Sequence, residues 1–312
     1  MQYEKFFVTL MLLAVMISST ARAAEFEMVE YSAQVKLQWL AAAGIPQAQK
    51  FLKEIDRPVF FTANNLNDFE RIQRVNSLYQ ELNFAAAINF VREKNYSNVF
   101  DLACSLSPRA MILGDEGRKV VVGELNTVCL IGDWMVDEFG AQSKNTVDYE
   151  AFPIEDTAAM IAASDKFTGE ICIIEQGLMI YLNDLQRGKM YDNIHAVLKK
   201  HGGCMITSDF TQKKYFTDVA AALYGTQEAA TIYAETKAMY EKVLDDKIAD
   251  EVLQDERTAM DFLAQHGLQA EKIPLFSTTP GLYCAKNFTA EQLAKVNEVA
   301  AKKYLWVITP LD

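Results

Sequence analysis

Apolar residues recur at three- and four-residue steps over two long stretches near the start of the chain. The first stretch runs from 25 to about 55, and the second runs from about 67 to 93. In the second, Phe69, Ile72 and Val75 begin an apolar stripe that continues at the same spacing. This period is that of an α-helix with one buried face. The pattern therefore predicts helices before the first strand.

The pattern then changes to short runs that are apolar at consecutive positions. Four such runs occupy 98–103, 119–124, 170–175 and 203–209, and a helical segment at 184–200 separates the last two. Strands that are buried on both faces have this texture, which is typical of a parallel sheet covered by helices. The alternation of strands with helices predicts a doubly wound α/β sheet.

A long helical and partly acidic stretch follows the fourth run, from about 216 to 266. We interpret it as an insertion that packs over the carboxyl edge of the sheet as a lid. Gly267 is placed to end its last helix. Two later runs, 271–277 and 304–309, are predicted to be strands that close the sheet.

Composition excludes some functions. The 312 residues are 50% hydrophobic and 23% charged, which permits a large buried core. The net charge of −12 argues against a surface that binds nucleic-acid phosphates. The five cysteines lack CxxC spacing and the three histidines lack metal-ligand spacing. We therefore expect buried free thiols and no metal site.

The N-terminal 24 residues carry a different signal. An apolar run over 6–17 precedes an Ala-Arg-Ala triplet at 21–23, which fits a signal-peptidase site. The run is too short for a stable membrane span. Three interpretations stay open: a cleaved signal peptide, a buried first helix, or a gene start placed upstream of a true initiator at Met16 or Met28.

The candidate chemistry lies where the predicted strands end, because open α/β sheets bind ligands outside the carboxyl ends of their strands. Small residues after the first strand, such as Ala103 and Ser105, let the backbone approach a ligand closely. Asp101 is placed to accept hydrogen bonds from an ammonium group or from loop amides. Glu124 ends the second strand, where a carboxylate can bind both hydroxyls of a ribose. We expect the polar segment 145–148 to follow a strand and to meet an adenine edge.

Four segments resemble motifs of the leucine carboxyl methyltransferase-like family, which includes polyketide O-methyltransferases. The segment 175–182, EQGLMIYL, is similar to the family's EGLLMYL segment and is the most specific of the four. The segments 98–109, 122–126 and 261–267 resemble its first cofactor motif, its second strand end and a late helix. The resemblance covers about 57–312. It implies a class I methyltransferase with a Rossmann-like, doubly wound, seven-stranded sheet that uses S-adenosylmethionine (SAM).

With this resemblance the chain divides into five parts. They are an apolar N-terminal segment (1–24), an N-terminal helical cap (25–96), a SAM-binding core (97–215), a helical lid insertion (216–266) and the final strands of the core (267–312). Because SAM is made and kept in the cytosol, the resemblance favours a cytoplasmic protein. An exported protein is the alternative if residues 1–23 are a cleaved signal peptide.

The resemblance also implies a role for each residue that matches a motif. The cofactor would be bound at the strand ends by Asp101, Ala103, Cys104, Ser105, Glu124, Asn145, Asp148, Glu175, Gln176 and Gly177. The first four would hold the methionine part, Glu124 the ribose, and Asn145 with Asp148 the adenine. The last three would line the floor between cofactor and acceptor. Arg109 would hold an acceptor carboxylate or fix the loop, and Tyr181 would line the acceptor pocket.

Three positions depart from the family's pattern. Ser105 and Gln176 stand where the family has glycine, and the acid at the second strand is Glu124 rather than aspartate. The side chain of Ser105 crowds a tight backbone approach. A non-catalytic SAM-binding protein of the same fold is therefore the alternative to an active enzyme.

The expected reaction is O-methylation of a small molecule. No histidine lies at a strand end to act as a base, which favours a carboxylate acceptor over a hydroxyl. Asp209, in the run at 203–209, is either an acceptor-side acid or a helix cap. Tyr224, Tyr233 and Tyr240 predict an aromatic pocket or the packing of an amphipathic lid. A nicotinamide-dependent oxidoreductase is disfavoured, because the first loop lacks GxGxxG.

Overall fold

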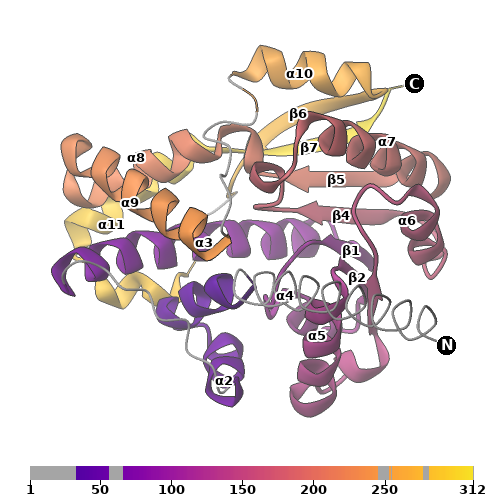
Figure 1. Ribbon diagram of the computed structural model, residues 1–312, viewed down its shortest axis with the longest axis horizontal. Helices are drawn as coiled ribbons and strands as arrows, with labels where there is room; N and C mark the ends of the chain where they lie inside the picture. Colours follow the sequence, from indigo (N-terminus) through magenta and orange to yellow (C-terminus); the bar gives the residue numbers. More distant parts are fainter. Residues whose placement is uncertain (1–32, 56–65, 245–252, 254, 277–280, 312) are drawn as a thin grey trace, which may run out of the picture.

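The computed structural model describes residues 33–55, 66–244, 253, 255–276 and 281–311 (Figure 1). The apolar segment expected over 1–24 lies outside the described residues. Residues 33–43 and α2 (Pro46–Glu54) are helical, and α3 (Leu66–Glu93) forms the second helical stretch. Pro46 occupies the first turn of α2, where its missing N–H leaves no hydrogen bond unmade. The helical predictions are thus confirmed over the described residues.

Seven strands form one sheet in the order β3-β2-β1-β4-β5-β7-β6. They are β1 (Asn98–Leu102), β2 (Lys119–Glu124), β3 (Val147–Ala151), β4 (Ile171–Glu175), β5 (Gly203–Thr207), β6 (Leu268–Pro274) and β7 (Tyr304–Pro310). Strands β1 to β5 pair in parallel, whereas β7 is antiparallel to both β5 and β6. The strand order changes direction between β1 and β4, at the switch point where such sheets bind ligands. The predicted Rossmann-like, doubly wound, seven-stranded sheet is confirmed.

Strand β3 was not located from the sequence, and its burial explains why. β1 and β4 are buried at every residue, which produces the continuous apolar runs that predicted them. In β3 only Val147 is buried, and the rest are half-buried or exposed. β3 is an edge strand and pairs only with β2, so a continuous apolar run is not required of it.

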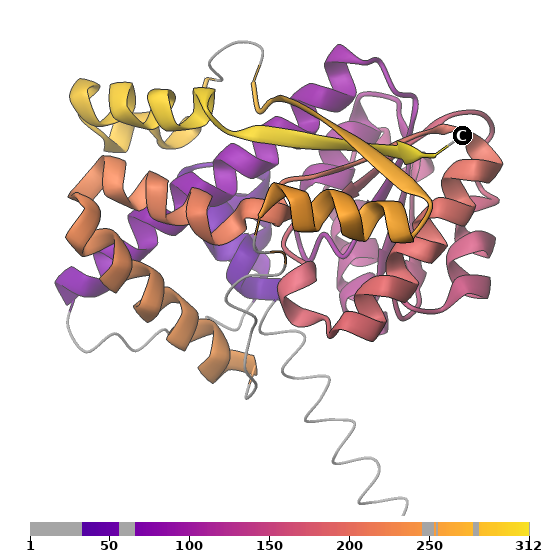
Figure 2. The same ribbon diagram turned by 90° about the horizontal axis from the view of Figure 1, so that it is seen from above.

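Helices cover both faces of the sheet (Figures 1 and 2). They are α4 (Arg109–Asp115), α5 (Asn126–Phe139), α6 (Thr157–Ser164), α7 (Asp184–His201) and α10 (Glu256–Gln265). Adjacent strand residues point to opposite faces, so Val99 joins the core under α3, α4 and α5, whereas Phe100 joins the core under α6, α7 and α10. An apolar core therefore packs on each face of the sheet, and the two cores fix the positions of its strand ends.

The arrowheads of β4 and β5 point toward two antiparallel helices (Figure 1). These helices are α8 (Gln212–Tyr224) and α9 (Thr226–Leu244), which pack against each other and against α3. They stand beyond the carboxyl edge, where the lid was expected. We call α3, α8 and α9 the cap helices.

The described end of the expected lid, over 255–266, lies elsewhere. α10 packs on β6, and the ring of Phe262 meets that of Tyr191 in α7 with centroids 5.2 Å apart. α10 is therefore part of the helical layer on the sheet. Among the described residues of 216–266, those of α8 and α9 occupy the position expected for the lid. The sequence patterns did not predict α11 (Ala290–Ala301). This helix lies between β6 and β7 in the sequence and packs on α8.

All five cysteines are free and buried, as predicted. Within the part of the chain that the structure describes, no helix has both the length and the apolar character needed to cross a membrane.

Candidate functional site

A cavity of about 600 Å³ lies at the carboxyl edge of the sheet, between the strand ends and the cap helices. Its sheet side is lined by residues that end or follow four neighbouring strands: Ser105, Glu124, Gln176 and Asp209. The volume is within the range of small-molecule sites. The position is the one that this sheet topology favours for a ligand.

The loop after β1 turns in an unusual backbone conformation. Ala103 and Ser105 have φ angles of 49° and 58°, in the left-handed region that favours glycine. The Ala103 N–H donates to the Gly123 carbonyl at 2.8 Å, which ties the start of the loop to β2. Both residues line the cavity. A left-handed residue other than glycine costs about 1–2 kcal/mol, so the surrounding structure must hold this turn in place.

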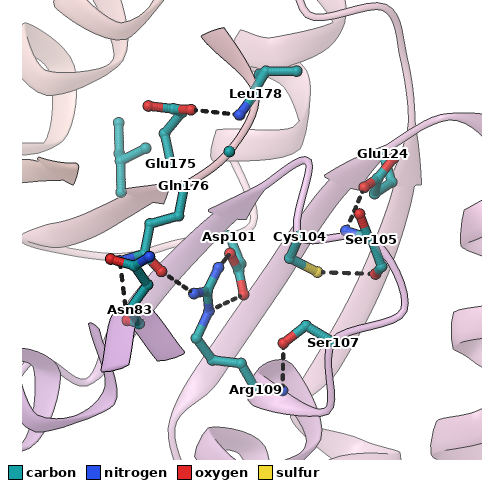
Figure 3. Close-up of polar contacts among 12 residues, drawn as sticks. Asn83, Asp101, Cys104, Ser105, Ser107, Arg109, Glu124, Glu175, Gln176 and Leu178 are labelled. Carbon is teal, nitrogen blue, oxygen red and sulfur yellow. Dashed lines mark hydrogen bonds and ion pairs between the residues drawn. The ribbon is translucent and has the colours of Figure 1, made fainter. Parts of the chain in front are cut away.

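Glu124 fixes the same loop from the end of β2 (Figure 3). Its Oε1 accepts the Ser105 N–H at 2.7 Å, and its Oε2 accepts the Leu125 N–H at 2.9 Å. Each carboxylate oxygen has a second lone pair, so the group can still accept hydrogen bonds from a ligand in the cavity. Burial raises the pKa of Glu124, although the two backbone N–H groups oppose that shift.

Asp101 and Arg109 form a buried ion pair, which corrects the role expected for Asp101 and selects one of the two expected for Arg109 (Figure 3). The Arg109 Nε and Nη2 donate to the two carboxylate oxygens at 2.8 and 2.5 Å. Asp101 is 0% exposed and Arg109 is 1% exposed, so neither side chain reaches the main cavity. Burial alone would lower the pKa of Arg109, but the charge and hydrogen bonds of Asp101 raise it. Arg109 fixes the loop, the second of its expected roles, and Asp101 is occupied by Arg109 instead of a ligand.

Gln176, which stands where the family has glycine, connects three parts of the site (Figure 3). Its Oε1 accepts from Arg109 Nη1 at 2.6 Å, and its Nε2 donates to the Asn83 carbonyl of α3 at 3.1 Å. Its own carbonyl accepts from Lys36 Nζ at 3.3 Å. Burial, followed by the charge of Arg109, lowers the pKa of Lys36. The departure from glycine therefore supplies a polar connection between the β4 end and the cap.

Two carboxyl groups lie together at the ends of β4 and β5. Glu175 is 0% exposed; its Oε2 accepts from the Thr207 hydroxyl at 2.8 Å, and its Oε1 accepts from the Leu178 N–H at 3.1 Å. Burial, and then the neighbouring charge of Asp209, raises the pKa of Glu175 well above its ordinary value. Asp209 accepts the Gly177 N–H on both oxygens, at 2.9 and 2.8 Å. Burial and the charge of Asp209 thus both favour the neutral form of Glu175.

Asn145 and Asp148 do not reach the cavity, which corrects the position predicted for them. They precede and begin β3 instead of following a strand. Asp148 forms ion pairs with Lys119 and Lys166 near the amino end of the sheet. The residues that do follow β3 and line the cavity are Phe152, Pro153, Ile154 and Glu155. Because β3 was not located from the sequence, the wrong end of it was assigned to the site.

The structure brings six of the twelve predicted site residues to the cavity wall: Ala103, Ser105, Glu124, Gln176, Gly177 and Tyr181. Cys104 and Glu175 lie behind the wall, both 0% exposed. In the lid, Tyr233 and Tyr240 line the cavity, whereas Tyr224 does not.

Sequence reasoning missed several polar side chains that line the cavity from helices, among them Lys36, Tyr79 and Lys213. The available signal was weak, because each is a polar or amphipathic residue next to an apolar helical stripe, which usually marks the edge of a packed face. Only the packing of the helices against the strand ends identifies them. Among the described residues, no group of three or more potential metal ligands is present.

No family model and no curated protein matches the sequence of this chain. Solved structures match its fold. A DUF574-family protein from Streptomyces avermitilis superposes with a TM-score of 0.52 at 10% identity, over 89% of this chain and 97% of that one. This similarity supports the Rossmann-like fold.

Two further solved structures are methyltransferases. Magnesium protoporphyrin IX methyltransferase from Synechocystis, with bound SAM, has a TM-score of 0.45 at 8% identity, over 86% of this chain and 92% of that one. An O-methyltransferase from neocarzinostatin biosynthesis, in complex with SAM, has a TM-score of 0.46 at 10% identity, over 78% of this chain and 59% of that one.

Proposed function

We propose that this protein is a SAM-dependent class I methyltransferase that modifies a small molecule. The observation that carries the proposal is Glu124, a buried carboxylate at the end of β2 that lines the cavity and holds the tight loop after β1. That arrangement suits a ribose beside a closely approaching backbone. The motif resemblance over 98–109 and 175–182 points to the same cofactor.

The residues present fit SAM. The cavity wall at Ala103 and Ser105 would face the methionine part, Glu124 would accept the ribose hydroxyls, and the segment 152–155 would flank the adenine. When bound, SAM supplies an activated methyl group on a sulfonium. The protein's own task is to align the donor and acceptor and to exclude water, which the enclosing cap helices favour.

O-methylation of a carboxylate is the form of the reaction that the site supports best. Transfer to a carboxylate needs no general base, whereas a phenol or alcohol does. No histidine is among the described residues that line the cavity. Asp209 lines it, but both of its oxygens already accept the Gly177 N–H. This preference also agrees with the leucine carboxyl methyltransferase-like resemblance.

Calorimetric titration with SAM and with S-adenosylhomocysteine (SAH) tests the cofactor assignment. We expect the native chain to bind both, and Glu124→Ala to weaken binding about 10- to 100-fold, because it removes hydrogen bonds to a charged group. Glu150→Ala is the matched control: Glu150 is a carboxylate of β3 that pairs with Lys166 away from the cavity. Absence of binding by the native chain, or equal binding by both variants, would contradict the assignment.

A SAM-binding protein without turnover is the second candidate, and the strained Ser105 favours it. SAM affinity without methyl transfer to any carboxylate in an acceptor screen would select this candidate. We also propose a cytoplasmic location, where SAM is available. Mass spectrometry of cellular fractions tests it, and cleavage after Ala23 in an exported fraction would contradict it.

A further inference from the structure

The charges that line the cavity are segregated by their source. The carboxylates come from the strand ends and their loops: Glu124, Glu155 and Asp209. Every charged residue that the cap helices contribute to the lining is a lysine, namely Lys213 of α8 and Lys237 of α9. In a chain of net charge −12, a cationic cap side is unlike the average surface. Lys36, from the helical segment 33–43, also lines the cavity, but its Nζ donates to the Gln176 carbonyl. The cap side is therefore the side that favours an anionic ligand group.

The same cap side carries a continuous aromatic wall. The ring of Phe216 lies between those of Tyr79 and Tyr233, with centroids 5.3 and 5.9 Å away and edge-on contacts to both. Tyr240 follows Tyr233 by two helical turns on the same face of α9 and accepts the Trp39 Nε1–H at 3.1 Å. All four rings line the cavity. Such a wall fits a flat apolar or aromatic group.

Lys213 is the cation best placed to receive an anion. Its Nζ lies 5.3 Å from the centroid of the Tyr233 ring, at the aromatic wall. No carboxylate of the described residues lies within ion-pair distance of Lys213, whereas Lys237 pairs with Glu241 at 2.9 Å. Lys213 therefore offers an ammonium group whose hydrogen-bonding capacity a ligand can use.

We propose that the cap side binds the methyl acceptor and that this acceptor is an aromatic acid. Its ring packs on Phe216 and Tyr233, and its anionic group binds Lys213. The cofactor would occupy the opposite side, at Glu124 and the loop after β1, so the acceptor takes the remaining wall. This inference rests on the proposed function only in naming the ligand an acceptor.

Three matched probes test the charge preference by calorimetry: biphenyl-4-carboxylate, biphenyl-4-methanol and biphenyl-4-methylamine. We expect the carboxylate to bind the native chain about tenfold tighter than the alcohol, as one charge-assisted hydrogen bond provides, and the amine to bind most weakly. Equal affinities, or tighter binding of the amine, would overturn the proposal.

Two neighbouring lysines provide a matched pair of variants. Lys213→Met should reduce the preference for the carboxylate to about one and leave alcohol binding unchanged, because it removes the charge and keeps an apolar stem. Lys214→Met should keep the full preference, since Lys214 is exposed, pairs with Asp218 and does not line the cavity. Lys213→Arg, which keeps the positive charge, should retain most of the preference for the carboxylate. A preference that persists in Lys213→Met would overturn the assignment of the anion site.

A parallel SAH titration separates this inference from the proposed function. SAH binding without a carboxylate preference would reject the aromatic acid and keep the methyltransferase. A carboxylate preference that depends on Lys213, without SAH binding, would keep the ligand class and reject the methyltransferase.

Discussion

The two sides of the cavity are built in different ways. On the sheet side, backbone groups and buried side chains satisfy one another: Glu124 binds two amides, and Arg109 binds Asp101 and Gln176. On the cap side, the lining consists of aromatic rings, lysines such as Lys213 and neutral polar side chains such as Thr236, which come from α3, α8 and α9. The sheet side depends on contacts between strand ends, whereas the cap side depends on individual side chains from three helices.

This difference indicates a division of tasks. A network of buried polar groups resists substitution, because any deleted partner leaves another group unsatisfied. A lysine on the face of a helix, such as Lys213, can change with little effect on the fold, whereas Phe216 and Tyr79 also belong to the apolar core. We therefore expect variants on the sheet side to alter stability or cofactor binding, and variants on the cap side to alter acceptor choice.

The largest effect is expected at Arg109. Arg109→Met leaves the carboxylate of Asp101 buried without a cation and removes a partner of Gln176. We expect the free energy of unfolding to fall by about 3–5 kcal/mol, as it does when one member of a buried ion pair is deleted. Urea denaturation of both proteins measures the change.

A surface pair provides the control for Arg109. Arg92 pairs with Glu116, and Arg92 is 47% exposed. Arg92→Met should cost about 1 kcal/mol or less. The double variant Asp101→Leu, Arg109→Met should recover much of the loss, because no charge is left buried. Equal losses for Arg109→Met and Arg92→Met would refute the view that the sheet side is a connected network.

The next effect is a dependence of SAH affinity on pH. Burial raises the pKa of Glu124 above its ordinary value of 4.5. The protonated group accepts fewer hydrogen bonds, so affinity should fall as the pH decreases through this raised pKa, by up to about tenfold per pH unit. The fall should therefore begin at a higher pH than for an ordinary glutamate. SAH titrations at successive pH values upward from the ordinary glutamate pKa would measure the profile.

Glu124→Gln is the control for the pH profile. Its amide does not titrate, so the affinity of the variant should be lower and flat over the same range. A native profile that matches that of Glu124→Gln would show that Glu124 does not bind the cofactor in its charged form.

The smallest effect is expected at Ser105. Ser105→Gly removes the cost of a left-handed φ but adds freedom to the unfolded chain, so we expect a net gain of up to about 1 kcal/mol. SAH affinity should be unchanged or tighter, because the loop keeps its N–H toward Glu124. Ser97→Gly is the control, since Ser97 has no positive φ and should lose stability. Weaker SAH binding by Ser105→Gly would indicate that the serine side chain itself contacts the cofactor.

The sequence determined the elements whose burial is uniform. β1, β2, β4 and β5 are covered by helices on both faces, and this position requires continuous apolar runs. The location of Glu124 followed directly, because a residue that ends a recognised central strand must lie at the carboxyl edge. The edge strand β3 gives no such run, so the predicted adenine residues Asn145 and Asp148 fell at its wrong end.

Only the tertiary structure decided which polar groups are partners. Arg109 and Asp101 are eight residues apart, and Gln176 joins them from 67 residues beyond Arg109. Helical periodicity predicted α8 and α9, but it does not specify that Lys213 and Phe216 face the strand ends. The periodicity of apolar residues indicates which positions are buried, because burial follows from the local sequence. It does not indicate what a buried group contacts, because that depends on how distant segments pack.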